Sequence, residues 1–248
     1  MDTAVIPDPV PRGTTPHAVD LNADLGEEVT DDTALLAVVT SANVACGYHA
    51  GSVQVMRAVC AEAARLGVSV GAQVSYDDRD NFGRVELEVS VAVLREQVAD
   101  QVGTLATIAE AEGTEVCYVK PHGALYHRVA HDEGQAAAVL AGSGSLPVLG
   151  MPGALVLALA AGAGRLTRHE GFPDRGYDDA GRLLPRDRPG AVLTNADEVA
   201  HRAVVLAAEV DSVCLHGDTP GAVAHAVAVR RRLEATGFRL ESCWLASG

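Results

Sequence analysis

Lysine occurs once in this chain, at Lys120, although the chain contains 19 lysine and arginine residues in total. It stands in the stretch YVKPHGALYH (118–127), directly after a predicted strand and before His122. An ammonium group is a compact point charge, whereas a guanidinium is a wide planar fork, so a small site that needs one cation favours lysine. Pro121 removes a backbone donor, and Gly123 permits the close approach of a ligand. We therefore interpret Lys120 as a functional cation rather than a solvated residue at a strand end.

Polar residues that can move protons or bind ligands follow nearly every predicted strand. A parallel barrel opens all of its strand C-termini onto one face, and an open α/β sheet gathers them at one edge. Segments far apart in the chain should therefore converge, and we expect one polar pocket. In chain order, the clusters are Asp20, Asn22 and Asp24; Asn43 and His49; Gln73, Ser75, Asp77 and Arg79; Lys120 and His122; Glu170, Asp174 and Arg175; and His216 and Asp218.

Each of these residues also has a structural interpretation. Asp218 can cap the last helix, and Asp20 and Asp24 can be loop carboxylates. Cys46 and Cys214 fall near the same face, but neither has a nucleophile signature, so both are interpreted as small buried filler. Structural roles are also open to His49, His122 and His216. The histidines of the tail or of predicted helices that we treat as non-functional are His17, His131, His201 and His225.

The elements that must position these residues alternate between strand and helix. Seven strand–helix repeats are found, and such alternation is typical of a parallel sheet covered by helices. We predict an α/β fold in the form of a distorted seven-stranded parallel (β/α) barrel, or a barrel with one gap. A doubly wound open sheet is the alternative. The predicted strands are 18–21, 41–46, 68–72, 116–119, 147–150, 165–170 and 212–215.

Several helix boundaries can be predicted from capping residues. Ser52 and Ser90 each precede an apolar stripe with helical spacing and are expected N-caps. Asn195 opens a capping-box pattern. The last helix is expected to be capped by Asp218 or Thr219.

Length and composition bound the interpretation. The 248 residues fit one barrel-sized domain over 18–248, after a proline-rich tail over 1–17 that we expect to be disordered. A net charge of −14 disfavours nucleic acid and anionic lipid as partners. Five cysteines without a CxxC pair indicate reduced thiols and a cytoplasmic protein, and neither a membrane span nor a signal peptide is predicted. The sequence contains no GxxxxGK[ST] loop, no GxGxxG after a strand, no GxSxG elbow and no HExxH.

Six stretches carry a resemblance to a known family. These stretches and their order resemble those of the LamB/YcsF family. They span residues 20–223, which is nearly the whole domain. The resemblance implies a barrel-like β/α fold related to the glycoside hydrolase/deacetylase group. It also implies the A subunit of a bacterial ATP-dependent 5-oxoprolinase that acts with B and C subunits, and a homo-oligomer is left open. The stretches are DLNADLGE (20–27), SANVACGYHAG (41–51), YDDRDNFGR (76–84), VKPHGALYH (119–127), EGFPDRGYDDAGRLLPRDRPGAV (170–192) and CLHGDTPGAV (214–223).

The reaction implied by the resemblance opens 5-oxo-L-proline to L-glutamate, and hydrolysis of ATP to ADP and phosphate drives this otherwise uphill step. Phosphorylation of the lactam oxygen would make the ring carbon electrophilic, so that water can attack it. The pathway needs a cation at the phosphoryl group, for which Lys120 and Arg175 are candidates, and a base for water. Mg²⁺ that accompanies ATP could be held by carboxylates such as Asp20 and Asp24.

These requirements divide the polar residues into expected roles. Catalytic roles are expected for Asp20, Asp24, His49, Lys120, His122 and His216. Substrate-binding roles are expected for Asn22, Asn43, Gln73, Arg79, Glu170, Asp174, Arg175 and Asp218. The candidate metal ligands are Asp20, Asp24 and His49.

One position departs from the family pattern. Family members usually read GAHPS after the third strand, where this chain reads GAQVS, so Gln73 stands at a histidine position. An amide cannot act as an imidazole base and is a poor ligand for a transition metal, so the resemblance does not carry a bound transition metal over to this chain. Two alternative functions stay open. One is a metal-dependent deacetylase or amidohydrolase on the same barrel, and the other, favoured by Gln73, is a non-catalytic binding protein.

Overall fold

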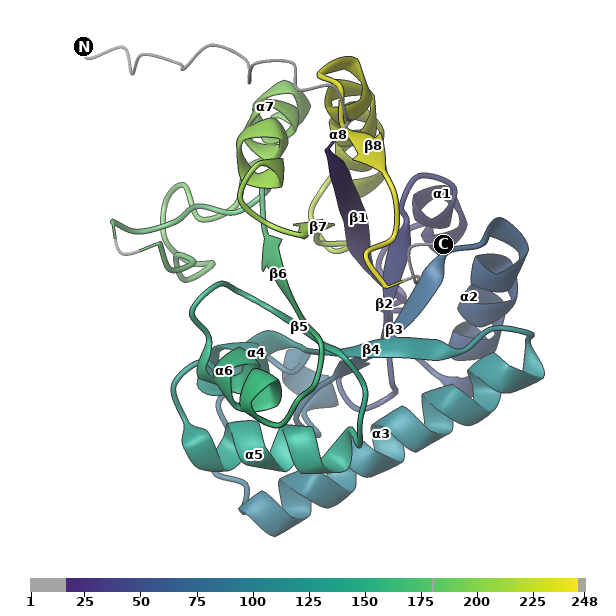
Figure 1. Cartoon of the computed structure of the whole chain (residues 1–248), viewed down its shortest axis with the longest axis vertical. Helices are drawn as coiled ribbons and strands as arrows, with labels where there is room; N and C mark the ends of the chain where they lie inside the picture. Colours follow the sequence, from purple (N-terminus) through teal and green to yellow (C-terminus); the bar gives the residue numbers. More distant parts are fainter. Residues whose placement is uncertain (1–16, 180, 245–248) are drawn as a thin grey trace.

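Strand β1 (Ala18–Leu25) pairs in parallel with both β2 (Ser41–Ala45) and β7 (Ser212–Leu215) in the computed structural model, which describes residues 17–179 and 181–244. This double pairing closes the sheet into a barrel (Figure 1). Its other strands are β3 (Ser69–Val74), β4 (Val116–Pro121), β5 (Val148–Gly150) and β6 (Thr167–Gly171). The predicted seven-stranded parallel barrel is confirmed, and the open-sheet alternative is wrong. The predicted tail over 1–17 lies, except for His17, outside the described residues.

The barrel is distorted at two of its joints. Strands β4 and β5 share one residue pair, Val119 with Val148, and β6 pairs with β7 only through Glu170 and Gly171. A further short strand, β8 (Arg239–Leu240), adds to the first residues of β1. Two residues are too few for a period-2 pattern, so nothing in the sequence indicates β8.

Side chains of β1 alternate between the barrel interior and the surrounding helices. Asp20, Asn22 and Asp24 occupy alternate positions and contact residues of β7, β2 and β4 inside the barrel. The prediction that β1 ends at residue 21, and that these polar residues follow it, is therefore wrong. A polar interior interrupts the apolar run that indicates a buried strand. The outward side chains belong to the hydrophobic core and are Val19, Leu21, Ala23 and Leu25.

Helices surround the barrel, and Figure 1 shows α7 beside α8 at one end of the molecule and α3 beside α5 at the other. Among the described residues, no helix has the length and apolar character needed to span a membrane. The helices of the described segments are α1 (Asp32–Leu36), α2 (Val53–Leu66), α3 (Val91–Ala111), α4 (Gly123–Arg128), α5 (Glu133–Gly142), α6 (Leu155–Gly162), α7 (Ala196–Ala207) and α8 (Ala222–Ala235), together with the 3₁₀ helix η1 (Arg79–Asn81).

Three of the predicted helix starts are confirmed, and the fourth is wrong. The side chains of Ser52, Ser90 and Asn195 accept hydrogen bonds from backbone N–H groups in the first turns of α2, α3 and α7. Helix α8, by contrast, begins after Gly221, whose φ of 83° lies in the left-handed region. Neither predicted cap is available, because Asp218 binds two arginines and the Thr219 hydroxyl donates to Asp174.

A glycine in β3 tests the packing inside the barrel. A Cβ atom at Gly71 would lie 2.2 Å from the ring of Tyr118, which is fully buried on β4. We expect Gly71→Ala to lower the free energy of unfolding by about 1–3 kcal/mol, because the ring has no room to move. Gly103→Ala on the exposed face of α3, where nothing lies within 4 Å, should instead raise it by about 0.5–1 kcal/mol. Urea unfolding of both variants checks this, and equal effects would contradict it.

Candidate functional site

A pocket of about 370 Å³ opens at the carboxyl ends of the barrel strands. Its walls come from the ends of β1, β4 and β7, from residues after β3, and from the long segment between β6 and α7. Four of its lining residues are arginine or lysine and one is a carboxylate, so cationic groups face the pocket although the whole chain is acidic. The lining residues are Asp24, Arg84, Lys120, Pro121, His122, Gly123, Ala124, Tyr126, His127, Phe172, Arg175, Leu183, Leu184, Pro185, Arg186 and His216.

Lys120 lies at the base of this pocket, at the end of β4, and is only 3% exposed. Its Nζ is 3.0 Å from Asp24 Oδ1, 3.1 Å from Glu170 Oε2 and 3.1 Å from Cys214 Sγ. Burial alone would lower the pKa of Lys120, but the attraction of Asp24 and Glu170 outweighs it and holds the pKa well above its usual value. The side chain is therefore a fixed cation and not a base. The compact ammonium fits between groups of β1, β6 and β7, which explains why the position needs lysine.

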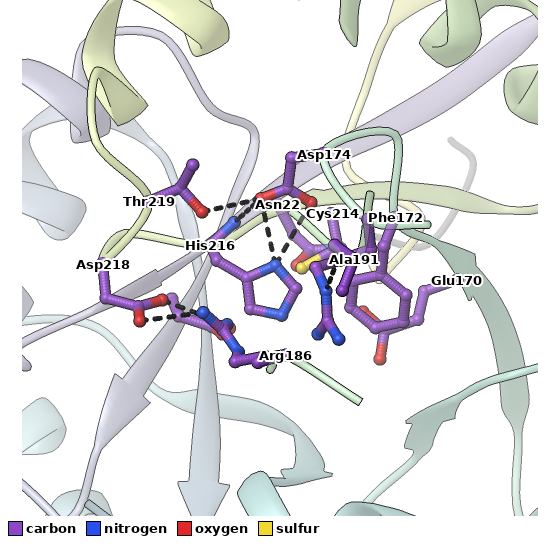
Figure 2. A network of polar contacts seen from close by, with 12 residues as sticks. Asn22, Glu170, Phe172, Asp174, Arg186, Ala191, Cys214, His216, Asp218 and Thr219 are labelled. Atoms are coloured by element: carbon purple, nitrogen blue, oxygen red, sulfur yellow. Dashed lines mark hydrogen bonds and ion pairs between the residues drawn. The ribbon is translucent and has the colours of Figure 1, made fainter. Parts of the chain in front are cut away.

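His216 is oriented by Asp174, as Figure 2 shows. The imidazole Nδ1 lies 3.0 Å from Asp174 Oδ2, and the same carboxylate accepts hydrogen bonds from the His216 backbone N–H and the Thr219 hydroxyl. Burial alone would raise the pKa of Asp174, but His216 and these hydrogen bonds keep it below its usual value. An ionised Asp174 holds the proton of His216 on Nδ1, so Nε2 is free to accept a proton in the pocket.

Two arginines at the pocket mouth share one carboxylate. Arg186 donates to Asp218 at 3.1 and 3.2 Å, and Arg84 also forms an ion pair with Asp218 (Figure 2 shows Arg186 and Asp218). Burial opposes it, but Arg186 and then Arg84 hold the pKa of Asp218 below its usual value. Arg175 lies deeper, where its guanidinium donates to the carbonyls of Ala191 and Leu184. One negative charge between two guanidiniums leaves a net positive charge at the mouth.

Beside the pocket lies a second group of polar side chains, Glu27, His49, Gln73 and His122, which we call the Glu27 cluster. Glu27 Oε1 lies 3.7 Å from His49 Nε2, 3.6 Å from His122 Nδ1 and 3.0 Å from Gln73 Nε2. The two imidazole rings stack with centroids 4.0 Å apart. Burial lowers the pKa of His49 to about 4 and that of His122 well below its usual value, so both are neutral near pH 7. Neutral imidazoles next to a carboxylate are a donor set that can hold a metal ion.

Asp20 does not belong to the pocket. It lies four residues before Asp24 on the same strand, a distance of about 13 Å along the strand, and it is fully buried. There its carboxylate accepts hydrogen bonds from the hydroxyls of Thr40, Ser41 and Ser212. The predicted location of Asp20 in the pocket is therefore wrong, and Asp20 and Asp24 lie too far apart to ligate one Mg²⁺.

Three residues expected to bind substrate also lie outside the pocket. Asn43 donates to Asn22 Oδ1 at 2.7 Å and to Asp24 Oδ1 at 2.9 Å within the barrel, so the Asn43 amide supports the Asp24 carboxylate. The side chain of Arg79 is 52% exposed and donates to the carbonyls of Gly47 and Gly51. It joins two loops on the outside of the site.

The other expected residues are brought together as predicted. Asp24, Lys120, His122, Arg175 and His216 line the pocket. The remaining ones contact lining residues or belong to the Glu27 cluster, and they are His49, Gln73, Glu170, Asp174 and Asp218.

Sequence reasoning missed Glu27, Arg84 and Arg186. Glu27 ends the stretch DLNADLGE, but a strand predicted to stop at residue 21 places it six residues away from the strand end instead of two. Arg84 and Arg186 stand inside two of the quoted stretches, far from any predicted strand end. Their presence in those stretches was the one signal that could have identified them.

Comparison with known proteins gives consistent results. The sequence model described as the LamB/YcsF family matches residues 19–246. A protein of Streptomyces avermitilis that is named as the A subunit of 5-oxoprolinase is 53% identical and is matched over 90% of this chain and 98% of its own length. A lactam utilization protein from Thermus thermophilus has a structure similar to this one, with a TM-score of 0.84, 34% identity and coverage of 90% of this chain and 99% of that one. A peptidoglycan deacetylase from Bacillus subtilis, at 14% identity, shares only the fold, with a TM-score of 0.53 over 93% of this chain and 89% of that one.

The buried cation makes a prediction about stability. We expect Lys120→Met to lower the free energy of unfolding by about 3–5 kcal/mol, because Asp24 and Glu170 would stay buried without their cation. Arg57→Met removes a cation from an exposed ion pair with Glu112 and should leave stability nearly unchanged. Urea unfolding at pH 7 measures both. A Lys120→Met protein as stable as the wild type would contradict the assignment of Lys120 as the counter-charge.

Proposed function

The chain belongs to the LamB/YcsF family, and we propose that it is the A subunit of an ATP-dependent 5-oxoprolinase that acts with separate B and C subunits in the cytoplasm. The observation that carries this proposal is a cationic pocket with a buried, permanently charged Lys120 at its base and a histidine base at its side. Relatives that are named as this subunit, and that this chain matches over nearly their full length, support the proposal. The overall reaction converts 5-oxo-L-proline, ATP and two water molecules into L-glutamate, ADP and phosphate.

The substrate has two groups that match the two ends of the pocket. Its carboxylate is an anion, and the net positive charge around Arg84 and Arg186 at the mouth suits it. Its lactam oxygen gains negative charge during reaction, and the ammonium of Lys120 at the base can stabilise that charge. Asp24 and Glu170 hold the ammonium in place, so little reorganisation is needed when charge develops.

The proposed chemistry proceeds in balanced steps. The lactam oxygen attacks the γ-phosphorus of ATP, the bond to ADP breaks, and a phosphorylated ring imidate forms. A water molecule gives a proton to His216 Nε2 and attacks the ring carbon, after which the carbon–nitrogen bond breaks and the nitrogen takes up protons. This leaves an acyl phosphate, and a second water molecule cleaves it to L-glutamate and phosphate. Mg²⁺ would enter with ATP as part of the co-substrate.

Within these steps, this chain contributes a base and fixed charges. Asp174 keeps His216 in the tautomer that accepts a proton on Nε2, and it stabilises the imidazolium that results. Phe172 stacks on the imidazole at 5.1 Å between ring centroids and limits access of bulk water to that side. The partner subunits are proposed to supply what the chain's sequence lacks, namely a recognisable nucleotide-binding motif.

A second function is favoured by one observation, the Glu27 cluster. A carboxylate with two neutral imidazoles beside the pocket suits a metal-dependent deacetylase or amidohydrolase. Such an enzyme would release acetate or another acid from an amide without consuming ATP. A non-catalytic binding protein would bind 5-oxoproline and release nothing, with or without partners. Both alternatives are separated from 5-oxoprolinase by the same assay.

That assay is reconstitution with B and C subunits purified from a bacterium whose 5-oxoprolinase is complete. We expect glutamate and ADP to form in equal amounts only when this chain, both partners, ATP and 5-oxo-L-proline are present together. The chain alone should produce little or none of either, because its sequence carries no nucleotide-binding motif. Glutamate formation by the chain alone would contradict the need for partners. No glutamate from the complete mixture, while the partners function with the corresponding chain of a relative, would contradict the function.

The proposed base makes a separate prediction. In the reconstituted enzyme, His216→Asn should lower kcat by about 10²–10⁴-fold, the usual contribution of a general base. Asp174→Asn should also lower kcat, because an amide at this position no longer fixes the required tautomer. His201→Asn, on the exposed face of α7, is the matched control and should retain activity. Wild-type turnover by His216→Asn would show that the base lies elsewhere.

A further inference from the structure

We propose that the Glu27 cluster binds one divalent transition-metal ion through Glu27, His49 and His122, with the amide oxygen of Gln73 as the fourth ligand. The four residues come from the loop after β1, the loop after β2, the end of strand β3 and the loop after β4. Of the metal ligands expected from sequence, the proposed set retains His49 but not Asp20 or Asp24. Asp24 is taken by Lys120 and Asn43, and Asp20 lies at the other end of the barrel.

The first observation is that polar atoms are buried in the cluster without partners. Within residues 17–179 and 181–244, no hydrogen-bond partner is found for either ring nitrogen of His49, for Glu27 Oε2 or for Gln73 Oε1. His49 is 1% exposed and Glu27 is 4% exposed, so bulk water does not satisfy these atoms. Buried polar groups in native proteins are almost always hydrogen-bonded or bound to a metal. Four such atoms in one small cluster point to a missing ligand.

The second observation is the spacing of the candidate ligand atoms. Ligands at about 2.1 Å from a tetrahedral metal ion are about 3.4 Å from one another. The distances from Glu27 Oε1 to His49 Nε2 and His122 Nδ1 are 3.7 and 3.6 Å, and the Gln73 amide lies 3.0 Å from Glu27 Oε1 and 2.9 Å from His122 Nδ1. The candidate Glu27 and histidine atoms all lie within 4.8 Å of one another. The histidines and Glu27 would have to move slightly together, and Gln73 slightly away from them, to give a tetrahedral site.

The third observation concerns the proton on His122. Its Nε2 lies 3.2 Å from the carbonyl oxygen of Phe82, which can only accept a hydrogen bond. The proton of the neutral ring therefore belongs on Nε2, and Nδ1 directs a lone pair at the cluster. A backbone carbonyl that fixes the tautomer of a histidine in this way is the usual second partner of a metal-binding imidazole.

Gln73 can serve either of two arrangements. With its amide nitrogen toward the cluster, it donates to Glu27 and His122, and its own oxygen stays unpaired. A half-turn of the amide exchanges the two atoms, and the oxygen then faces the carboxylate. Two such oxygens repel unless a cation lies between them. The amide oxygen is the weakest of the four ligands, so the two imidazoles and the carboxylate carry most of the binding. Two nitrogens and two oxygens suit Zn²⁺, Co²⁺ or Mn²⁺, whereas Mg²⁺ prefers oxygen ligands alone. Because His122 also lines the pocket, the ion could polarise a carbonyl oxygen bound there.

Metal content tests this directly. The chelator-treated protein is loaded with Zn²⁺, Co²⁺, Mn²⁺ or Mg²⁺ separately, dialysed, and measured by mass spectrometry of the metals. We expect one transition-metal ion per chain, no retained Mg²⁺, and loss of the ion in Glu27→Gln and His49→Ala. Gln73→Leu should weaken Co²⁺ binding by about 10-fold, and Gln73→His should strengthen it and change the visible absorption of the Co²⁺ protein. His127→Gln removes a pocket histidine outside the cluster and should bind the ion like wild type.

Circular dichroism checks that each variant is folded. If Glu27→Gln does not fold, the uncharged substitutions Gln73→Leu and Gln73→His still test the site. A wild-type protein that retains no transition metal after loading would overturn the proposal, and Gln73 would then be a hydrogen-bonding filler. Equal metal binding by wild type, Glu27→Gln and His49→Ala would overturn it as well. Metal content does not depend on turnover, so this outcome is independent of whether the protein is a 5-oxoprolinase.

Discussion

The buried ion triad of Lys120, Asp24 and Glu170 is the interaction on which the rest of the site depends. It joins β4 to β1 and β6 across the barrel, so the interior can be polar only while the barrel is closed. An ammonium in this position is stable because two carboxylates face it, and the carboxylates are stable for the same reason. The Asn43 amide, which also donates to Asp24, extends this network toward the centre of the barrel. The ion pairs that allow charged side chains inside the barrel therefore also position the groups of the site.

Much of this architecture can be predicted from the sequence because it rests on local signals. The alternation of apolar runs and helical stripes predicts the seven strands, and capping by Ser52, Ser90 and Asn195 predicts three helix starts. The position of Lys120 after an apolar run places it at the mouth of a barrel. These features depend on neighbours within a few residues, which a single sequence contains.

The remaining features depend on partners far away in the chain. Asp218 binds Arg84 and Arg186 instead of capping α8. The two arginines lie in loops more than 30 residues before Asp218, so no local sequence pattern predicts this pairing. The end of β1 is hidden because its inward residues are polar, so its strand pattern reads as a loop. A strand end predicted too early then makes Glu27 look distant from the strand, although it lies two residues after β1. Polar barrel interiors therefore conceal both the length of a strand and the residues just beyond it.

The cationic pocket stands in contrast to the charge of the molecule around it. The chain carries a net charge of −14, yet four of the side chains that line the pocket are cations, and Asp24 is the one carboxylate among the lining residues. Asp218 and Glu170 contact three of these cations from outside the lining. At physiological ionic strength fields fade within about 8 Å, so a small anion is repelled by the acidic surface at a distance and attracted only once it is inside. Long-range attraction normally speeds capture in dilute salt. Here added salt should raise the association rate of an anion while it lowers the affinity of the pocket for that anion. The association rate and the affinity therefore respond to ionic strength in opposite directions.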